Sequence, residues 1–340
     1  MRYLKRWGFG LLVAIATVVS VMAGWQTHTF AQAPAEPQSI ESSITLESAG
    51  LTLKEMADGV YGLIASTDFP PADFAGTAIC NGAIVIGNDG ALVIDPFQNE
   101  ALADLLFATV ESLTDLPVRY VVNTHYHFDH TGGNLAAAQR TVPILGRGPI
   151  REWMATRNVE LDPTPTLPTV IVNGTGDLWL GDRQIYIQDM EGHSGGTDMI
   201  VYVPDADVLV AGDLLFHQRI PYLVDGNIRL WQETLDVLMD TYPTATVLPG
   251  HGLITDVQGL QQQKEYVDYL EAIALEWRDA GITQEEAMAT TNLPPEYADY
   301  KFQGLFPTNI EAAYQQITAG HSAASVAARH ASDSIYVRGL

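Results

Sequence analysis

Short apolar runs and helical repeats alternate along the first half of the chain. Two apolar runs flank the sequence Gly87-Asn-Asp-Gly90, which is typical of two strands joined by a tight turn. Apolar residues then recur at every third or fourth position, which predicts a helix. In chain order, the expected elements are strands at 84–86 and 91–95, a helix at 99–113, strands at 118–123 and 142–145, and a helix at 149–158. This alternation predicts an α/β fold.

The second half of the chain starts with strands and ends with helices. Residues 204–207 have the composition of a hairpin turn between two apolar runs. The expected elements are strands at 169–172, 184–188, 199–203 and 208–211, a helix at 229–242, a strand at 245–248 and a helix at 260–280. Two capping boxes, Thr283 with Glu286 and Thr308 with Glu311, predict further helix starts. Gly320 is expected to end the last helix.

The N-terminal segment has the pattern of an export signal. Basic residues precede an apolar run over 7–25, and cleavage is expected after Ala31 or Ala35. The apolar run is also long enough to remain as an uncleaved membrane anchor. Both interpretations place the rest of the chain outside the cytoplasm, in the periplasm or the extracellular space.

These patterns divide the chain into consecutive parts. An α/β domain contains every candidate site residue, and helices follow it. The expected parts are a signal peptide or N-terminal anchor at 1–35, a polar linker at 36–50, the α/β domain at 51–257, a C-terminal helical extension at 258–320 and a flexible tail at 321–340.

The composition allows a full core and limits the partners. Hydrophobic residues make up 47% of the chain, and its formal net charge is −24. This charge disfavours nucleic acid, because binding to phosphates requires clustered Lys and Arg. It also disfavours anionic lipid surfaces. We therefore expect a small-molecule substrate, no nucleic acid, and membrane contact only through an uncleaved anchor.

Cys80 is the only cysteine, so no disulfide can form within the chain. Its position before an apolar run favours a small buried residue, and a reactive thiol is the alternative. Stability is therefore expected to come from the core and from bound metal.

The strongest chemical signal is the motif His125-Tyr-His127-Phe-Asp129-His130. It groups four candidate metal ligands directly after the strand expected at 118–123, and loops at strand ends often display functional groups. In an extended segment His125 and His127 project from the same side, so they can bind one ion. Imidazole and carboxylate ligands without thiolate suit zinc, iron or manganese. We interpret the motif as a metal site.

Further acids and histidines follow other expected strands. His193, Asp213 and His251 each stand beside glycines near a strand end, where the backbone can approach closely. Asp95 ends the strand expected at 91–95. Because α/β sheets gather functional groups at one edge, we expect these side chains to join the histidine motif.

This set of motifs resembles the metallo-β-lactamase superfamily, including its glyoxalase II-like hydrolases. The resemblance extends over about residues 56–255, with all five motifs of the family in order. It implies an αββα sandwich with a dinuclear metal site at one edge of two sheets, here followed by a C-terminal helical extension. The export signal and the segment 213–221 make the chain most similar to the exported SoxH-like metallohydrolases.

The resemblance also assigns the motif residues to two metal ions. The implied ligands are His125, His127 and His193 for the first ion and Asp129, His130 and His251 for the second, with Asp213 bridging both. Asp95 would be a structural acid near the site. The expected cofactor is a pair of divalent ions, zinc foremost, with iron or manganese as alternatives.

The implied chemistry is hydrolysis. Two ions about 3.5–4 Å apart can activate water and polarise a carbonyl group. We expect an exported hydrolase that cleaves an ester, thioester or related carbonyl bond by attack of metal-bound hydroxide. Asp129 would orient the hydroxide or relay a proton to the leaving group.

Departures from the family pattern narrow the range of expected substrates. Zinc β-lactamases carry Cys or Ser at the position of Asp213, so lactam cleavage is not expected. The segment 258–320 has few basic residues, which argues against glutathione recognition. His217 and Arg219 follow Asp213 and are candidates for lining the substrate pocket, with a surface or helix-end pair as the alternative.

Two other functions fit the same motifs. One is a mononuclear-iron sulfur oxygenase of the persulfide-dioxygenase type, which shares the histidine motif. It would show one iron per chain and oxygen uptake with a persulfide. The other is a non-catalytic protein whose metals only stabilise the fold, and it would turn over no substrate when loaded with metal.

Overall fold

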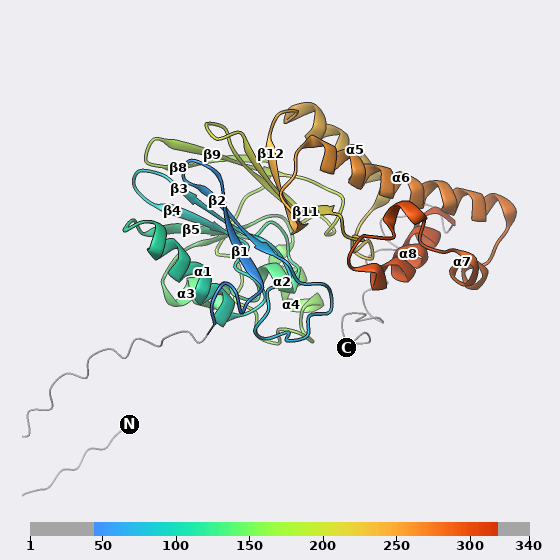
Figure 1. Ribbon diagram of the computed structural model, residues 1–340, viewed down its shortest axis with the longest axis horizontal. Helices are drawn as coiled ribbons and strands as arrows, with labels where there is room; N and C mark the ends of the chain where they lie inside the picture. Colours follow the sequence, from blue (N-terminus) through green and yellow to red (C-terminus); the bar gives the residue numbers. More distant parts are fainter. Residues whose placement is uncertain (1–43, 319–340) are drawn as a thin grey trace, which may run out of the picture. The chain divides into compact units, whose positions relative to one another are not determined.

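Two β-sheets lie face to face in the computed structural model, which describes residues 44–318 (Figure 1). The strands of the first sheet are, in spatial order, β1 (Leu51–Ala57), β2 (Val60–Ala65), β3 (Gly82–Ile86), β4 (Ala91–Ile94), β5 (Val118–Val122), β6 (Ile144–Gly146) and β7 (Val170–Ile171). Neighbours from β1 to β4 are antiparallel, and neighbours from β4 to β7 are parallel.

The second sheet is formed by the later strands. They are, in spatial order, β12 (Thr246–Gly252), β11 (Val208–His217), β10 (Met199–Val203), β9 (Arg183–Asp189) and β8 (Thr175–Leu180). Only β11 and β12 run parallel, and the other pairs are antiparallel. The turn expected at 204–207 joins β10 to β11 as a hairpin.

Helices cover the outer faces of both sheets. Those of the first half are α1 (Glu100–Leu113), α2 (Phe128–Thr131), α3 (Asn134–Gln139) and α4 (Ile150–Arg157). Those of the second half are α5 (Ile228–Thr241), α6 (Val257–Ala280), α7 (Gln284–Thr290) and α8 (Phe306–Thr318), with short 3₁₀ helices η1 (Pro295–Tyr297) and η2 (Gln303–Leu305). α1 and α3 share a core with the first sheet, and α5 and α6 share one with the second. The expected αββα sandwich is confirmed.

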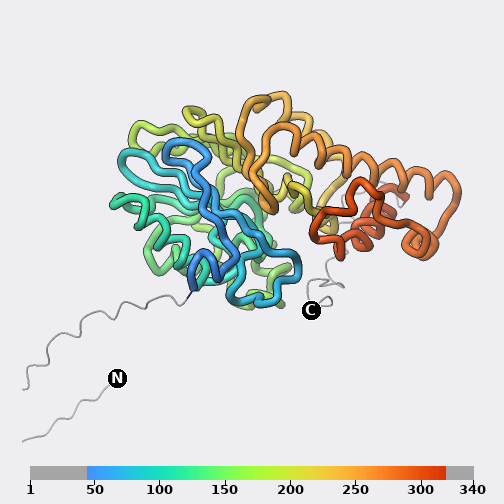
Figure 2. Tube along the Cα trace, viewed as in Figure 1, coloured from blue at the N-terminus to red at the C-terminus, as the bar shows by residue number. Residues whose placement is uncertain are grey.

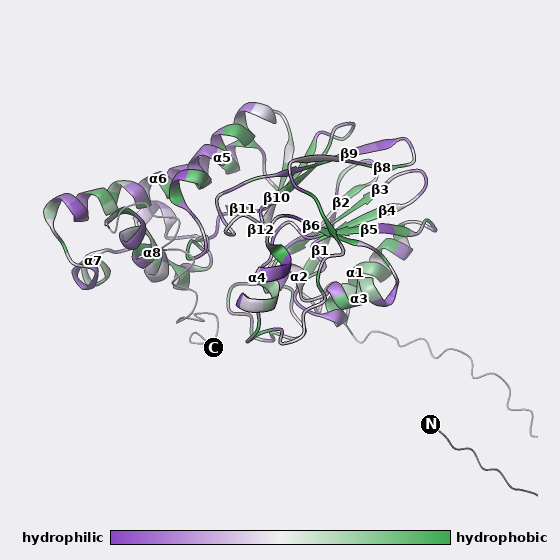
Figure 3. Cartoon of the chain, turned by 180° about the vertical axis from the view of Figure 1, so that it is seen from behind, coloured by the Kyte–Doolittle hydropathy of each residue, from purple (hydrophilic) through white to green (hydrophobic). Residues whose placement is uncertain are grey.

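Side chains that point alternately to the two faces of each strand build these layers. Ile84 and Val93 point to the helices outside the first sheet, whereas Val85 and Leu92 point to the second sheet. This is the period of two expected for strands with two buried faces. The central strands are accordingly hydrophobic along much of their length, while α6 and α7 carry polar residues on part of their surface (Figure 3).

The C-terminal helices are continuous with the core of the α/β part. One hydrophobic cluster contains Leu215 of β11 and Leu238 of α5 together with Leu270 of α6 and Ile310 of α8. Figure 2 shows the chain running outward along α6 and then returning through the region of α7 towards the sheets. Burial of shared apolar area therefore holds the extension to the sheets.

Some expected elements differ from the structure. The sequence patterns missed β1, β2 and β8. β1 and β8 are edge strands with exposed positions, and Gly62 interrupts the apolar run of β2. Such edges have too little apolar alternation to be distinguished from loops. The strand expected at 169–172 is limited to β7, and the strand expected at 208–211 continues to His217.

The two capping boxes have different outcomes. The box of Thr283 and Glu286 is confirmed at the start of α7. The box of Thr308 and Glu311 is wrong, because α8 already begins at Phe306. The Thr308 hydroxyl instead donates to the carbonyl of Leu305 at 2.7 Å.

The ends of the chain fall only partly within the described residues. Residues 44–50, the end of the expected polar linker, form a turn in which Ala49 is buried. The expected signal or anchor at 1–35, Gly320 and the tail at 321–340 lie outside the described residues. Across 44–318, no helix is both long and apolar enough to cross a membrane.

Candidate metal centre

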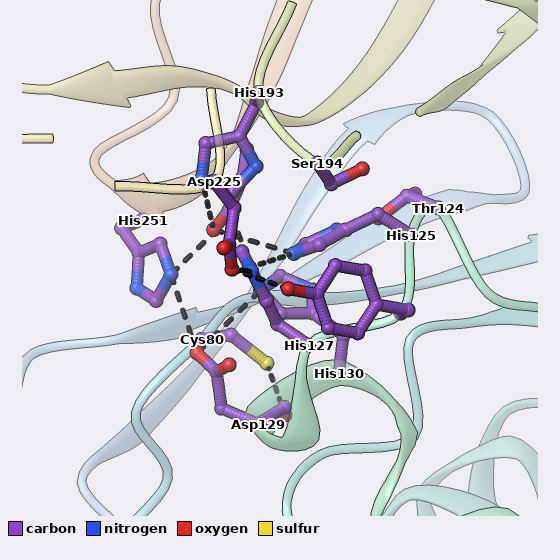
Figure 4. Close-up of polar contacts among 12 residues, drawn as sticks. Cys80, Thr124, His125, His127, Asp129, His130, His193, Ser194, Asp225 and His251 are labelled. Atoms are coloured by element: carbon purple, nitrogen blue, oxygen red, sulfur yellow. Dashed lines mark hydrogen bonds and ion pairs between the residues drawn. The ribbon is translucent and has the colours of Figure 1, made fainter. Parts of the chain in front are cut away.

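The residues singled out in the sequence converge at one edge of the two sheets (Figure 4). They come from the loop after β5 with α2, from the loop after β9, from the middle of β11 and from the end of β12. Every one of them is at least 96% buried: His125, His127, Asp129, His130, His193, Asp213 and His251. The expected convergence of separate strand ends is therefore present in the structure.

The first cluster contains His125, His127, His193 and one oxygen of Asp213. Nε2 of His125 lies 3.0 Å from Nδ1 of His127 and 3.5 Å from Oδ2 of Asp213. Nε2 of His193 lies 3.7 Å from the same oxygen. Ligands about 2.0–2.1 Å from a tetrahedral ion lie roughly 3.4 Å apart, so these spacings suit one metal ion.

The second cluster contains His130, His251, Asp129 and the other oxygen of Asp213. Oδ1 of Asp213 lies 3.1 Å from Nε2 of His130 and 3.3 Å from Nε2 of His251. Oδ2 of Asp129 lies 3.3 Å from the same atom of His251. The two oxygens of Asp213 thus face different groups of histidines.

Buried polar atoms without a hydrogen bond support a fit to metal ions. Nε2 of His130, Nε2 of His193 and Oδ1 of Asp213 are buried and make no hydrogen bond, although the first and the third lie 3.1 Å apart as an ion pair. Buried polar atoms without a partner are costly and rare in native proteins. Nitrogen and oxygen donors without thiolate match zinc, iron or manganese, so cations would satisfy these atoms.

Glycines allow the strand ends to meet. A Cβ on Gly250 would lie 1.9 Å from Oδ1 of Asp213, and Gly212 has a φ of +54° with its Cα close to Thr124. β11 also has register shifts on both sides of Gly212 where it pairs with β12. Only glycine tolerates such approach and such a backbone angle without strain. These glycines explain how a continuous β11 can direct Asp213 into the site.

Asp95 fixes the orientation of two histidines. Its Oδ2 accepts from Nδ1 of His130 at 2.8 Å and from the hydroxyl of Thr124 at 2.7 Å. Nδ1 of His125 lies 3.0 Å from the same Thr124 hydroxyl, which therefore accepts from it. Protons held on these outer nitrogens leave both Nε2 atoms free to bind metal. This geometry agrees with the structural role expected for Asp95.

Asp225, which no sequence pattern singled out, orients His127, the remaining histidine of the motif. Oδ2 of Asp225 accepts from Nε2 of His127 at 2.9 Å and from the hydroxyl of Tyr126. The guanidinium of Arg157 lies 3.8 Å from its other oxygen. The only sequence signal is an acid beside Gly226, the same glycine framing seen at Asp213. An acid beside glycine is also common in turns, so this signal is weak.

A buried acid shapes the loop that carries His193. Asp198 accepts from the backbone N–H groups of His193 and Ser194 at 3.0 and 2.9 Å. Burial raises the pKa of Asp198 to about 6, although these donors oppose the shift. The His193 ring packs on Trp231 with centroids 5.1 Å apart. Backbone and ring contacts together hold His193 in place.

Asn81, which no sequence pattern singled out either, holds the strand end that carries His251. Its side-chain amide donates to the carbonyls of Pro249 and Gly252 at 2.9 and 2.8 Å, and its Oδ1 accepts from Ala65 at 2.9 Å. One buried side chain therefore links the end of β2 to the end of β12.

Burial and charge give the two clusters different proton states. Burial lowers the pKa of His127 and, more strongly, of His193, so both rings are neutral. Burial acts in the same direction on His251, but the charge of Asp213 outweighs it and raises the pKa of His251 to about 9. Burial opposes ionisation of Asp213, yet the charges of His251 and His130 hold its pKa well below the usual range. The carboxylate that faces both clusters is ionised.

Cys80 lies beside the second cluster as a buried residue. Its Sγ donates to the backbone carbonyl of Asp129 at 2.9 Å. Burial raises its pKa to about 12, so the thiol is neutral. The structure supports the small buried residue and not the reactive thiol.

The two candidates for the substrate pocket differ in position. Nδ1 of His217 bonds to the carbonyl of Leu253 at 2.8 Å, and the residue pairs in register with Gly252 of β12. Arg219 is 6% exposed, and its guanidinium lies 5.5 Å from the ring centre of Phe302, which in turn contacts His251. Arg219 is therefore linked to His251 through the ring of Phe302.

Comparisons with known proteins agree with this geometry. The model of the metallo-beta-lactamase superfamily matches residues 75–251. A Bacillus subtilis (strain 168) protein named "Probable metallo-hydrolase YqgX" is 28% identical over 201 residues, which cover 55% of this chain and 92% of that protein. The human "Acyl-coenzyme A thioesterase MBLAC2" is 30% identical over 153 residues, 38% of this chain and 54% of the relative. The chain thus spans about half the length of this human relative.

A solved structure shows the same fold. The metallo-beta-lactamase from Pontibacter korlensis aligns with a TM-score of 0.55 and 21% identity. The alignment covers 64% of this chain and 99% of that chain. At this identity the likeness concerns the fold alone.

Proposed function

This chain belongs to the metallo-beta-lactamase superfamily, and from that premise we propose that it hydrolyses an ester, thioester or related carbonyl bond at a two-metal centre. The observation that supports this proposal most directly is the position of Asp213. One of its oxygens faces His125 and His193, and the other faces His130 and His251. A carboxylate shared in this way supports two adjacent ions.

The ligands follow from the two clusters. The first ion would be held by His125, His127, His193 and Asp213, and the second by Asp129, His130, His251 and Asp213. Zinc pairs of this kind polarise a carbonyl oxygen and lower the pKa of water from about 15.7 to roughly 7.

Asp129 is the proposed catalytic residue of the chain. Burial opposes its ionisation, but the charges of His130 and His251 hold its pKa below the usual range. An ionised Asp129 carboxylate can accept a hydrogen bond from the attacking water and orient it. The same carboxylate can then carry the water proton to the leaving group.

The substrate class follows from the residues around the site. Asp213 replaces the Cys or Ser of zinc β-lactamases, which favours substrates other than lactams. The name of the human relative supports a thioester. Lys264 and Arg278 of the extension are engaged with neighbouring acids, and Lys301 donates to the carbonyl of Ser66. These contacts leave little in the extension to bind the carboxylates of glutathione.

The N-terminal sequence supports export of this hydrolase to the periplasm or beyond. Cell fractionation and N-terminal sequencing of the mature protein test this part of the proposal. A chain in the cytoplasm that retains residues 1–35 would refute it.

Elemental analysis followed by a substrate panel tests the hydrolase. We expect two zinc ions per chain and turnover of at least one ester, thioester or lactone. Because Asp129 is also a proposed ligand, Asp129→Asn is assayed with zinc in excess and its metal content checked. With both sites filled, kcat should still fall at least 100-fold, in line with the effect of losing a general base. One iron per chain with oxygen uptake on a persulfide would identify the sulfur oxygenase instead. A fully loaded protein that turns over nothing would favour the non-catalytic role.

A further inference from the structure

His251 is held differently from the other histidines of the second cluster and the motif. His127 and His130 bond to carboxylates through their outer nitrogens, at 2.9 and 2.8 Å. Nδ1 of His251 meets only the backbone carbonyl of Ile79, at 3.2 Å. Among residues 44–318, no side chain makes a hydrogen bond with this outer nitrogen. The direction of the His251 ring therefore depends strongly on packing.

Two aromatic rings supply that packing. Phe216 stacks on His251 with centroids 4.8 Å apart and planes 15° apart. Phe302 contacts the same ring in a T-shaped arrangement, with centroids 5.3 Å apart and planes 71° apart. Offset stacking and edge contacts of this kind have defined geometry. Together they limit both the tilt and the rotation of the imidazole.

Phe302 reaches this place from the C-terminal extension. Its backbone N–H donates to the carboxylate of Asp68 at 2.9 Å, in the loop after β2. The neighbouring Lys301 exchanges backbone hydrogen bonds with the segment after β11, accepting from Ile220 at 2.9 Å and donating to Gln218 at 3.2 Å. The segment before η2 is therefore fastened to both sheets.

The backbone at Phe302 is in an uncommon conformation. Its φ is +62°, in the left-handed region, which is rare for a bulky residue. Such conformations persist where the surroundings over-determine them, often at functional sites. The side chain is 4% exposed, with Phe69 and Arg219 also contacting the ring. The chain thus keeps a large aromatic residue at a position where glycine would be easier.

We propose that Phe302 is a positioning residue for His251 and that the C-terminal extension thereby sets the affinity of the second metal site. The inference rests on the proposed two-metal function. The proposal gives the C-terminal extension a role at the metal centre that is independent of substrate recognition. Outer contacts that orient a metal ligand typically change metal affinity 10–100-fold when they are removed.

Zinc titration of the full-length metal-free protein, in competition with a chromophoric chelator, tests the proposal. Phe302→Ala should weaken the second zinc about tenfold and leave the first unchanged. Phe302→Gly should weaken it equally, because it also removes the ring while relieving the left-handed backbone. Phe302→Tyr keeps the ring and should restore most of the affinity.

Phe306→Ala is the matched control, since Phe306 is a buried aromatic residue of the same extension without a ring contact to His251. It should lower the unfolding temperature and leave both zinc affinities unchanged. Equal losses of the second zinc in the Phe302→Ala and Phe306→Ala variants would show a purely structural effect and overturn the proposal. Normal affinity in Phe302→Gly with a loss in Phe302→Ala would assign the effect to the backbone and overturn it too. A wild-type chain that binds only one ion would refute the two-metal function itself.

Discussion

Asp225 accepts a hydrogen bond from Nε2 of His127 at 2.9 Å, although the two residues are 98 positions apart. The proton on Nε2 leaves Nδ1 of His127 to face His125 at 3.0 Å. The carboxylate therefore selects which nitrogen of the imidazole points into the first cluster. Asp95 does the same for His130 on the other side of the site.

Asp225→Asn should weaken binding of the first metal ion about 10–100-fold, because the amide no longer fixes the His127 tautomer through a charged acceptor. Metal retained after dialysis against graded chelator measures this effect. Asp189→Asn is the control: its carboxylate bonds to the backbone N–H of Gly174 and pairs with Arg147, and it contacts no histidine among residues 44–318. Equal metal retention in both variants would contradict the role assigned to Asp225.

The residues of the two clusters could be predicted from the sequence because each one carries a local signal. His125, His127 and Asp129 share one motif, and His193 and His251 stand beside glycines at strand ends. Strand ends gather at one sheet edge whatever the details of the loops. The αββα layers follow in the same way from apolar strands that alternate with amphipathic helices.

The residues that orient the ligands could not be predicted, because their roles depend on distant contacts. Asn81 bonds to a carbonyl 168 positions away, and Asp225 has the sequence setting of an ordinary turn acid. In the sequence, Phe302 is one apolar residue among many in a region predicted to be helical. Edge strands such as β1 were not predicted from the sequence for a related reason. Half of their surface faces solvent, so their apolar pattern is weak.

Gly250→Ala should disrupt the metal centre directly. The new methyl group would lie 1.9 Å from Oδ1 of Asp213, and relief of this clash requires the strand end or the carboxylate to move away from its position between the two histidine clusters. We expect loss of at least one metal ion per chain and a decrease in stability of about 1–3 kcal/mol. Elemental analysis and denaturant unfolding measure the two effects.

Gly304→Ala is the control for this substitution. A methyl group there meets nothing within 4 Å, and its φ is not in the left-handed region. Metal content and stability should stay at wild-type levels. Retention of both ions by the Gly250→Ala variant would show that the bridge position of Asp213 is not required.

Asn81→Ala should destabilise the fold and the second site together. It removes two donors to the carbonyls of Pro249 and Gly252 and one acceptor for the N–H of Ala65. Leaving these buried groups unpaired costs about 2–4 kcal/mol in the free energy of unfolding. Urea unfolding of the metal-free protein measures that loss. Asn88→Ala, at an exposed turn, should change stability by less than about 0.5 kcal/mol, and an equal loss in both would contradict the argument.

Cys80 should be almost inert to alkylation in the folded protein. Burial raises its pKa to about 12, four units above pH 8, so only about one thiol in ten thousand is ionised there. The side chain is also fully buried, which shields the thiol from the reagent. Mass spectrometry after iodoacetamide treatment at pH 8 measures the labelling. Because Cys80 is the only cysteine, the same chain unfolded in guanidinium provides the control and should be labelled completely within minutes. Rapid labelling of the folded chain would instead identify an accessible, reactive thiol beside Asp129.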